Sequence, residues 1–280
     1  MTKQANDVFN GPLRRNPVNP RYFTDDSGKA IFLTGSHTWS VMQDIWLEST
    51  PRKNMDYDGY LQMMEDFGHN FLRFWQWNQT KNSPWNDIST LFDPMPYERT
   101  GPGIAQDGLE KFDLTKWNSK YFSRLRERVE KAEKKGIYVS IMFFEAWGIK
   151  YSNFYPDQDP WLCYPMNPKN NINGLTDNPV LENGQAFDFF SLNCPQLLNL
   201  QKEFIKKVID TVNDFDCVLY EICNEIPNRM EAIQWEDHLC EFVKQYEVSK
   251  PKQHPVGITG EGGDQDMDVL YATSADWIST

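Results

Sequence analysis

Short apolar runs rich in β-branched and aromatic residues alternate along this chain with longer segments whose apolar residues have helical spacing. Such runs are typical of buried strands, and the longer segments are typical of amphipathic helices. Repeated strand-then-helix order predicts parallel strands joined by right-handed crossovers. The expected strands are residues 30–39, 70–75, 137–144, 217–222, 255–260 and 276–279, and the expected helices are residues 58–67, 117–135, 195–212, 230–246 and 267–271.

This order favours an α/β fold of the barrel type over a dinucleotide-binding fold, because no glycine-rich phosphate motif follows the first strand. Six units are visible, and a closed barrel needs two more strands, or roughly 60 further residues. We therefore expect a (β/α)8 TIM barrel that is truncated after the sixth strand. A β-hairpin with a turn at Gly28 precedes it, so the expected organisation is an N-terminal extension and hairpin over 1–29 and one incomplete barrel over 30–280.

Two long segments, residues 78–113 and 150–194, interrupt the alternation. Both follow expected strands and are rich in Asn, Pro, Gly, Asp, Trp and Tyr. We expect them to be loops at the carboxyl ends of the strands. In a barrel this edge holds the active site, and long loops there shape a cleft.

Charge and composition restrict the partners. The formal net charge of -12 disfavours nucleic acid and anionic membranes, which would be repelled. Aromatic residues make up 14% of the chain, with ten Trp, and flat aromatic faces suit the binding of sugars. No apolar run reaches the ~18 residues of a transmembrane helix. We expect a carbohydrate substrate, no nucleic acid, no membrane, no cofactor and no metal.

The location of the protein is left open by the sequence. The first seven residues lack the apolar stretch of a signal peptide. The protein is therefore either cytoplasmic, or secreted or periplasmic with its signal already removed. The five cysteines show no CxxC spacing, which disfavours a zinc site, and pairing of Cys163 with Cys194 stays undecided.

The most specific signal is the end of the expected fourth strand, where an apolar run stops at Asn224 and Glu225 and is followed by Ile226-Pro227. A polar pair at the carboxyl end of a buried strand lies where barrel enzymes hold their chemistry. A Glu can give or take a proton there, and an Asn can bind a substrate hydroxyl. The alternative is a helix entry, with Asn224 as the N-cap and Glu225 in the first turn.

Residues 220–227, Tyr-Glu-Ile-Cys-Asn-Glu-Ile-Pro, resemble the Asn-Glu motif of clan A glycoside hydrolases, the cellulase-like barrels of the family five superfamily. Residues 71–75, Phe-Leu-Arg-Phe-Trp, resemble the second strand of that clan, which carries an Arg. The segment that begins at 19–23 and runs to 35–39 resembles the apiosidase-like and collagen-binding-associated branch. The resemblance covers roughly residues 10–280.

The resemblance implies retaining hydrolysis of O-glycosidic bonds in a plant or microbial poly- or oligosaccharide. It assigns Glu225 as the acid/base, Asn224 as the residue that binds the sugar 2-hydroxyl, and Arg73 as the cation that orients the nucleophile. A retaining mechanism needs a second carboxylate about 5 Å from the first. The clan places this nucleophile after a seventh strand, which is not seen here; Glu261, at the end of the fifth expected strand, is the weak candidate within the chain. We therefore expect these 280 residues alone to be a poor catalyst.

Further substrate contacts are expected from residues that follow the strand ends. Each has a structural alternative: packing in the core for the aromatic residues, a solvated loop carboxylate for Glu145, and a structural ion pair for Arg73. The expected substrate-binding residues are Asn224, Arg73, His37, Trp39, Trp75, Trp77, Glu145 and Trp147.

Two other functions fit the same barrel. One is a non-catalytic carbohydrate-binding barrel, which would need no second carboxylate. The other is a metal-dependent sugar isomerase or epimerase, although two of its histidines precede their strands and so lie at the wrong end of the barrel. The candidate ligands for that metal are His37, His69, Glu145, Glu225 and His254.

Overall fold

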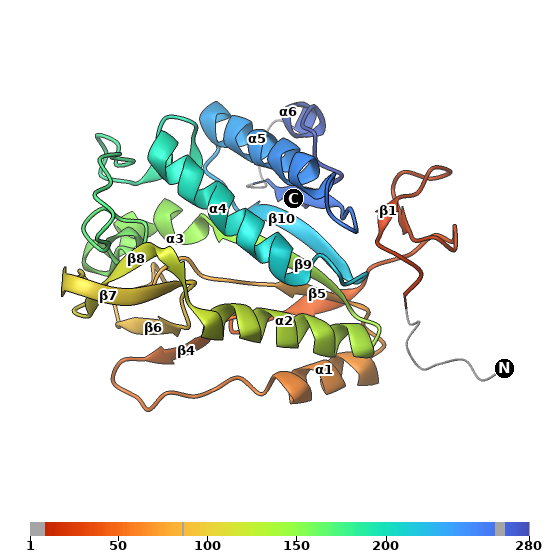
Figure 1. Ribbon diagram of the computed structural model, residues 1–280, viewed down its shortest axis with the longest axis horizontal. Helices are drawn as coiled ribbons and strands as arrows, with labels where there is room; N and C mark the ends of the chain where they lie inside the picture. Colours follow the sequence, from red (N-terminus) through yellow and green to blue (C-terminus); the bar gives the residue numbers. More distant parts are fainter. Residues whose placement is uncertain (1–8, 86, 261–266, 280) are drawn as a thin grey trace.

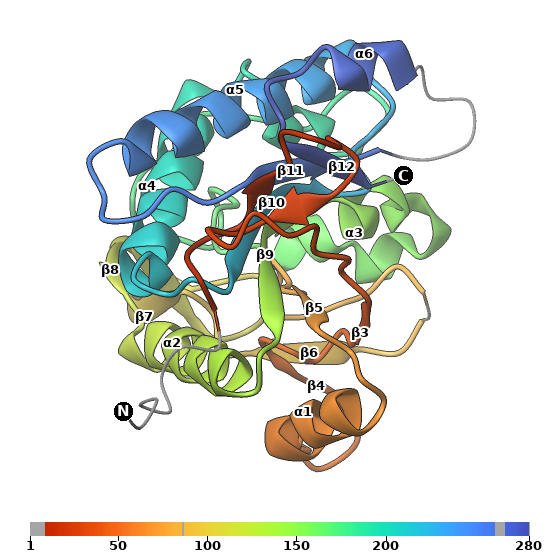
Figure 2. The same cartoon turned by 90° about the vertical axis from the view of Figure 1, so that its right-hand side faces the viewer.

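The computed structural model describes residues 9–85, 87–260 and 267–279, and among these residues six parallel strands form the central sheet. Their order in space is their order along the chain, so each strand lies beside the one before it. Crossovers that always step in one direction place the helices on one face, and the sheet curls into a half-barrel (Figure 2). The strands are β3 (Gly35–His37), β5 (Phe71–Phe74), β9 (Tyr138–Glu145), β10 (Val218–Asn224), β11 (Val256–Thr259) and β12 (Trp277–Ser279).

The helices of the crossovers lie side by side along the outside of the sheet (Figure 1). Local signals set their ends: the side chain of Asp56 accepts a hydrogen bond from the backbone N of Gly59 at 2.9 Å where the first helix begins, and Gly68 follows its end with a φ of +69°. The helices are α1 (Tyr57–Asp66), α2 (Ser119–Lys134), α3 (Trp147–Lys150), α4 (Pro195–Val212), α5 (Met230–Glu247) and α6 (Met267–Tyr271).

The core lies between the sheet and these helices. Every residue of β9 and β10 is buried, as expected for central parallel strands that are covered on both faces. Phe204, Ile205 and Val208 of α4 point into this core. Each such side chain stabilises the fold by about 1.5–3 kcal/mol when it is buried. The strands whose ends hold the candidate site are therefore anchored in a well-packed core.

The N-terminal hairpin is present, but in a different form from the one predicted. Strand β1 (Arg14–Arg15) pairs antiparallel with β2 (Phe23–Thr24), and the second expected arm contributes a single bridge from Ile31 to Phe23. The hairpin lies at the end of the sheet opposite to the carboxyl ends (Figure 1). Phe9 packs edge-on against Tyr138 with ring centroids 4.6 Å apart, so this extension covers the amino end of the sheet.

The prediction that 78–113 is a loop was wrong. The segment contains β6 (Thr90–Asp93), which pairs antiparallel with β4 (Asp44–Leu47), and a hairpin of β7 (Tyr97–Ile104) and β8 (Glu110–Trp117). Prolines, glycines and charged residues interrupt the apolar alternation of these strands, so their pairing depends on packing that the local sequence does not reveal.

Two smaller differences accompany this hairpin. The helix expected from Trp117 begins at Ser119, because Trp117 ends β8 opposite Tyr97. The segment 150–194 has no long element among its described residues. It contains short 3-10 helices at Ser152–Phe154 (η1), Pro156–Gln158 (η2), Pro160–Cys163 (η3) and Phe187–Phe190 (η4).

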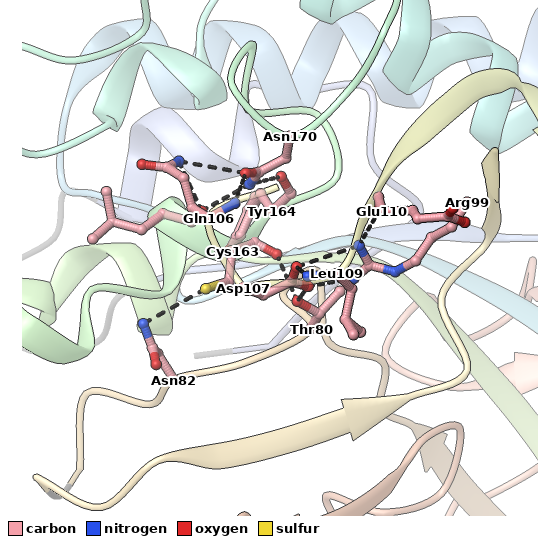
Figure 3. A network of polar contacts seen from close by, with 11 residues as sticks. Thr80, Asn82, Arg99, Gln106, Asp107, Leu109, Glu110, Cys163, Tyr164 and Asn170 are labelled. Atoms are coloured by element: carbon pink, nitrogen blue, oxygen red, sulfur yellow. Dashed lines mark hydrogen bonds and ion pairs between the residues drawn. The ribbon is translucent and has the colours of Figure 1, made fainter. Parts of the chain in front are cut away.

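A polar network joins these two long segments (Figure 3). Asp107 forms an ion pair with Arg99 and accepts a hydrogen bond from the Thr80 hydroxyl at 2.5 Å. The backbone N of Gln106 donates to Asn170 Oδ1 at 2.9 Å. The hairpin β7–β8 is thereby attached to the segment that follows β9, and the loops at the carboxyl end form one connected structure.

Two general findings complete the fold. No helix among the described residues is long and apolar enough to cross a membrane. Cys163 and Cys194 are both buried in the described part of the chain, and neither thiol is in a disulfide.

Candidate active site

An ion pair across the sheet is the centre of the candidate site. Arg73 on β5 donates from Nε to Oε2 of Glu221 on β10 at 2.9 Å, and a second guanidinium nitrogen contacts the other carboxylate oxygen. The hydroxyl of Thr259 on β11 donates to the same carboxylate at 2.9 Å. Burial opposes the charge on Arg73, but the hydrogen bonds and charge of Glu221 outweigh it and raise its pKa. Arg73 therefore forms the structural ion pair that the sequence analysis gave as its alternative role, and it also contacts Asn224.

Glu221 was not predicted, although its sequence held a signal. It lies in the middle of an apolar strand and its side chain is fully buried. A charged residue in such a place is almost always paired with an opposite charge. Its partner is the Arg predicted on β5, two strands away across the curled sheet, because β9 lies between β5 and β10.

Asn224 ends β10 beside this pair. Arg73 donates a hydrogen bond to Oδ1 of Asn224 at 2.8 Å. Because a guanidinium has only donors, the amide oxygen must face Arg73 and the amide nitrogen must face away. That nitrogen is buried and has no acceptor among the described residues, a state that costs about 1–3 kcal/mol. The site therefore holds an oriented donor that has no partner among the described residues.

Glu225 follows Asn224 in a strained backbone conformation. Its φ is +49°, in the left-handed region, where a non-glycine residue is strained by about 1–3 kcal/mol. Residues strained in this way cluster at functional sites. Its side chain is half-buried. The helix-entry alternative is wrong, because α5 begins at Met230 and its N-cap is Arg229.

Glu145 ends β9 directly beside Asn224 in the strand register. It is fully buried, which excludes the solvated loop carboxylate considered above, and its two oxygens accept from the backbone N of Gly148 at 3.0 and 3.2 Å. The pKa of Glu145 is raised to about 8, mainly by burial and in part by the charge of Glu225, although the hydrogen bonds from Gly148 lower it. The carboxyl group of Glu145 therefore holds the backbone at the start of α3 and does not face solvent.

His37, Trp75 and Trp77 form the wall next to Arg73. His37 is exposed at the end of β3 and stacks on Trp75 with ring centroids 5.8 Å apart. Burial, and then the charge of Arg73, lower the pKa of His37, so its imidazole is neutral near pH 7. Trp75 and Trp77 are 5% and 2% exposed, so they pack in the core and leave little surface for a sugar.

Trp39 and Trp147, in contrast, are accessible, and they are joined by Trp85, which was not predicted. Trp39 is 46% exposed. The rings of Trp85 and Trp147 stack with centroids 5.4 Å apart, and those of Trp39 and Trp147 with centroids 6.4 Å apart. The cluster of Trp39, Trp85 and Trp147 presents flat aromatic faces beside the carboxyl ends of the strands.

The remaining candidates lie elsewhere. Glu261 falls outside the described residues. His254 precedes β11 and is buried, with Nδ1 2.9 Å from Glu247 and Nε2 2.9 Å from the carbonyl of Phe215. In the part of the chain that the structure describes, no group of three or more His, Cys, Asp or Glu side chains is placed to hold a metal ion.

The fold is similar to those of known glycoside hydrolases. An endogalactoceramidase is 14% identical over 89% of this chain and 53% of its own, with a TM-score of 0.56. A glycoside hydrolase family 5 mannosidase from Rhizomucor miehei is 16% identical over 89% of this chain and 55% of its own, with a TM-score of 0.52. The endo-1,4-beta-mannanase from Rhizomucor miehei is also 16% identical, over 95% of this chain and 68% of its own, with a TM-score of 0.52.

This chain thus spans just over half the length of the first two proteins. At such identities the likeness establishes the fold alone, which matches part of the fold of these glycoside hydrolases. The chain belongs to the family described as Domain of unknown function (DUF6298), which matches residues 84–278. Comparison with curated proteins gave no match.

Proposed function

We propose that the protein is a glycoside hydrolase that cleaves O-glycosidic bonds of a poly- or oligosaccharide with retention of configuration. The observation that carries this proposal is the buried amide nitrogen of Asn224, which has no acceptor among the described residues and is oriented by Arg73 beside the strained Glu225. A donor fixed next to a carboxyl group at the carboxyl end of a parallel strand suits a sugar hydroxyl beside the bond to be cleaved.

The proposal extends to the fold. We take the six strands as the first six of a (β/α)8 barrel over 30–280, preceded by the hairpin region 1–29. Strands that follow one another in space without reversal support this, because a doubly wound sheet would reverse its order. Membership of the apiosidase-like branch stays a prediction.

In the proposed reaction, the carboxyl group of Glu225 gives its proton to the glycosidic oxygen as the bond to the anomeric carbon breaks. A carboxylate nucleophile takes that carbon and forms a glycosyl ester. Glu225, now ionised, removes a proton from water, which cleaves the ester and restores both groups. Asn224 donates to the hydroxyl next to the anomeric carbon, a contact that strengthens in the transition state.

The nucleophile is the open assignment. Two described carboxylates lie near Glu225, but Glu145 accepts from Gly148 and Glu221 is paired with Arg73, so neither is free to attack a sugar. Glu261 keeps its place as the weak candidate, and the resemblance places the nucleophile after a seventh strand. The expectation that these 280 residues alone are a poor catalyst stays a prediction.

The test uses the protein at its full encoded length, with aryl β-glycosides of good and poor leaving groups and with β-mannan, which the mannanase relative suggests as a first polymer. Glu225→Ala should slow poor leaving groups by about 10²–10⁴-fold. Activated substrates should suffer far less, and azide should partly restore their turnover by taking the place of water. Glu241→Ala, an exposed glutamate on α5, is the matched control.

Near-normal turnover of a natural glycoside by Glu225→Ala would refute the assignment. The non-catalytic carbohydrate-binding barrel makes a different prediction, since wild type and variant would then bind saccharides equally and cleave none. The metal-dependent isomerase gains no support from the geometry, because His254 lies at the amino end of β11 and both its ring nitrogens are engaged.

A further inference from the structure

A groove of about 540 Å³ leads away from the candidate active site. His37 is at its inner end. The ring of Trp75 lies between His37, which stacks on it, and the guanidinium of Arg73. Its outer part runs over the antiparallel ribbon of β4 and β6, an element outside the barrel sheet. The groove is lined by His37, Thr38, Trp39, Ser40, Ile45, Trp46, Leu47, Trp85 and Thr90.

The chemistry of this lining is uncharged. None of its described residues is Asp, Glu, Lys or Arg, and the pKa of His37 is lowered by burial and by Arg73. Its surface combines aromatic and aliphatic faces with side-chain hydroxyls. A sugar ring presents apolar CH faces and hydroxyl groups to such a surface. The nearby Arg52, which lies against Trp46, is already paired with Asp44 and Asp93, and the net charge of -12 would repel an anionic chain.

Trp46 at the outer part of the groove is held in place by charged neighbours. The guanidinium of Arg52 lies 5.1 Å from the centroid of the Trp46 ring. Arg52 itself is fixed by Asp44 and Asp93, each at 2.6 Å. Trp46 is half-buried and pairs with Leu91 across the ribbon, so its ring is a rigid platform on a different element from Trp39.

We infer that this groove binds a neutral oligosaccharide chain, with Trp39 and Trp46 as separate ring platforms, so that the substrate is a neutral polysaccharide and not a single terminal sugar. This inference rests on the proposed function, because it places the groove beside the bond to be cleaved. It adds the substrate class and assigns Trp46 as a residue that determines substrate length.

The test is calorimetric titration of the full-length protein with cellohexaose, mannohexaose and xylohexaose, and with a hexamer of galacturonic acid as the anionic probe. At least one neutral hexasaccharide should bind, and the anionic hexamer should not. Trp46→Ala should weaken the hexasaccharide about tenfold and weaken the matching disaccharide by less, because only the longer chain reaches both platforms. Trp46→Phe, which keeps a ring, should restore most of the affinity.

Phe67→Ala serves as the control, since this exposed aromatic residue follows α1 and does not line the groove. The inference is overturned if no neutral hexasaccharide binds, if Trp46→Ala binds it as tightly as wild type, or if the anionic hexamer binds best. Hydrolysis that depends on Glu225 without any dependence on Trp46 would refute the groove and leave the proposed function. Binding that depends on Trp46 without any hydrolysis would refute the proposed function instead.

Discussion

Removing the charge of Arg73 should destabilise the protein severely. Arg73→Met keeps most of the aliphatic volume but leaves Glu221 with a fully buried carboxylate and, among the described residues, only the hydroxyl of Thr259 as a partner. The substitution also removes the hydrogen bond that Arg73 donates to Oδ1 of Asn224. Deleting one partner of a buried ion pair costs about 3–5 kcal/mol, mainly because the remaining charge is uncompensated. Since the Arg73 side chain is 20% exposed and Thr259 still donates, we expect a loss of about 3 kcal/mol.

Urea unfolding at pH 7 measures this loss as a shift of the midpoint at constant slope. The double variant Arg73→Met/Glu221→Leu should recover most of it, because no charge is then left buried. Arg126→Met is the matched control: its ion pair with Asp214 has side chains that are 47% and 57% exposed, and such pairs contribute at most about 1 kcal/mol. The reasoning fails if Arg73→Met costs no more than Arg126→Met, or if the double variant loses the sum of its two single losses.

Three further predictions concern two buried carboxyl groups and one glycine. The pKa of Glu145 is about 8 in the folded protein against an ordinary 4.5, so between these values the folded state holds a proton that the unfolded state releases. The free energy of unfolding should therefore fall from about pH 5 to pH 8, and Glu145→Gln should flatten this decline in urea unfolding at several pH values. Glu236 is fully buried on α5, and burial raises its pKa, although a contact with the backbone N of Thr259, too poorly aligned for a full hydrogen bond, lowers it in part. Glu236→Met should therefore stabilise the protein by about 1–3 kcal/mol in the same assay, and a loss would show that the Thr259 contact stabilises the carboxyl group. A Cβ at Gly35 would lie 1.6 Å from the carbonyl oxygen of Phe71, so Gly35→Ala should push β3 away from β5 and lower the free energy of unfolding by at least about 3 kcal/mol. An unchanged melting temperature would contradict the strand register.

Local sequence predicted the sheet and its helices well. The helices expected at 195–212 and 267–271 match α4 and α6 at both ends. Their apolar spacing and their flanking residues act within a few positions of one another. The strand expected at 30–39 is found only at 35–37, because pairing with β5 decides which of those residues form ladder bonds.

The ribbons β4–β6 and β7–β8 and several site residues depend on contacts between distant segments. Trp85 and Trp46 lie in segments without a clear strand pattern, and their exposure is set by the ribbon that carries them. The pairing of Glu221 with Arg73 depends on the curling of the sheet, which brings β10 and β5 together across β9 and which no single strand specifies. Conversely, Trp75 and Trp77 were expected at the substrate but are buried, because a strand-end aromatic packs inward as readily as outward.

The most direct test of the central claim is a crystal structure of the Glu225→Gln variant with the neutral hexasaccharide that binds most tightly. The claim predicts a sugar hydroxyl within about 2.9 Å of Nδ2 of Asn224 and a glycosidic oxygen at hydrogen-bond distance from the side chain of residue 225. A saccharide bound elsewhere on the protein, with the amide of Asn224 still unpaired or bonded to a protein group, would contradict it.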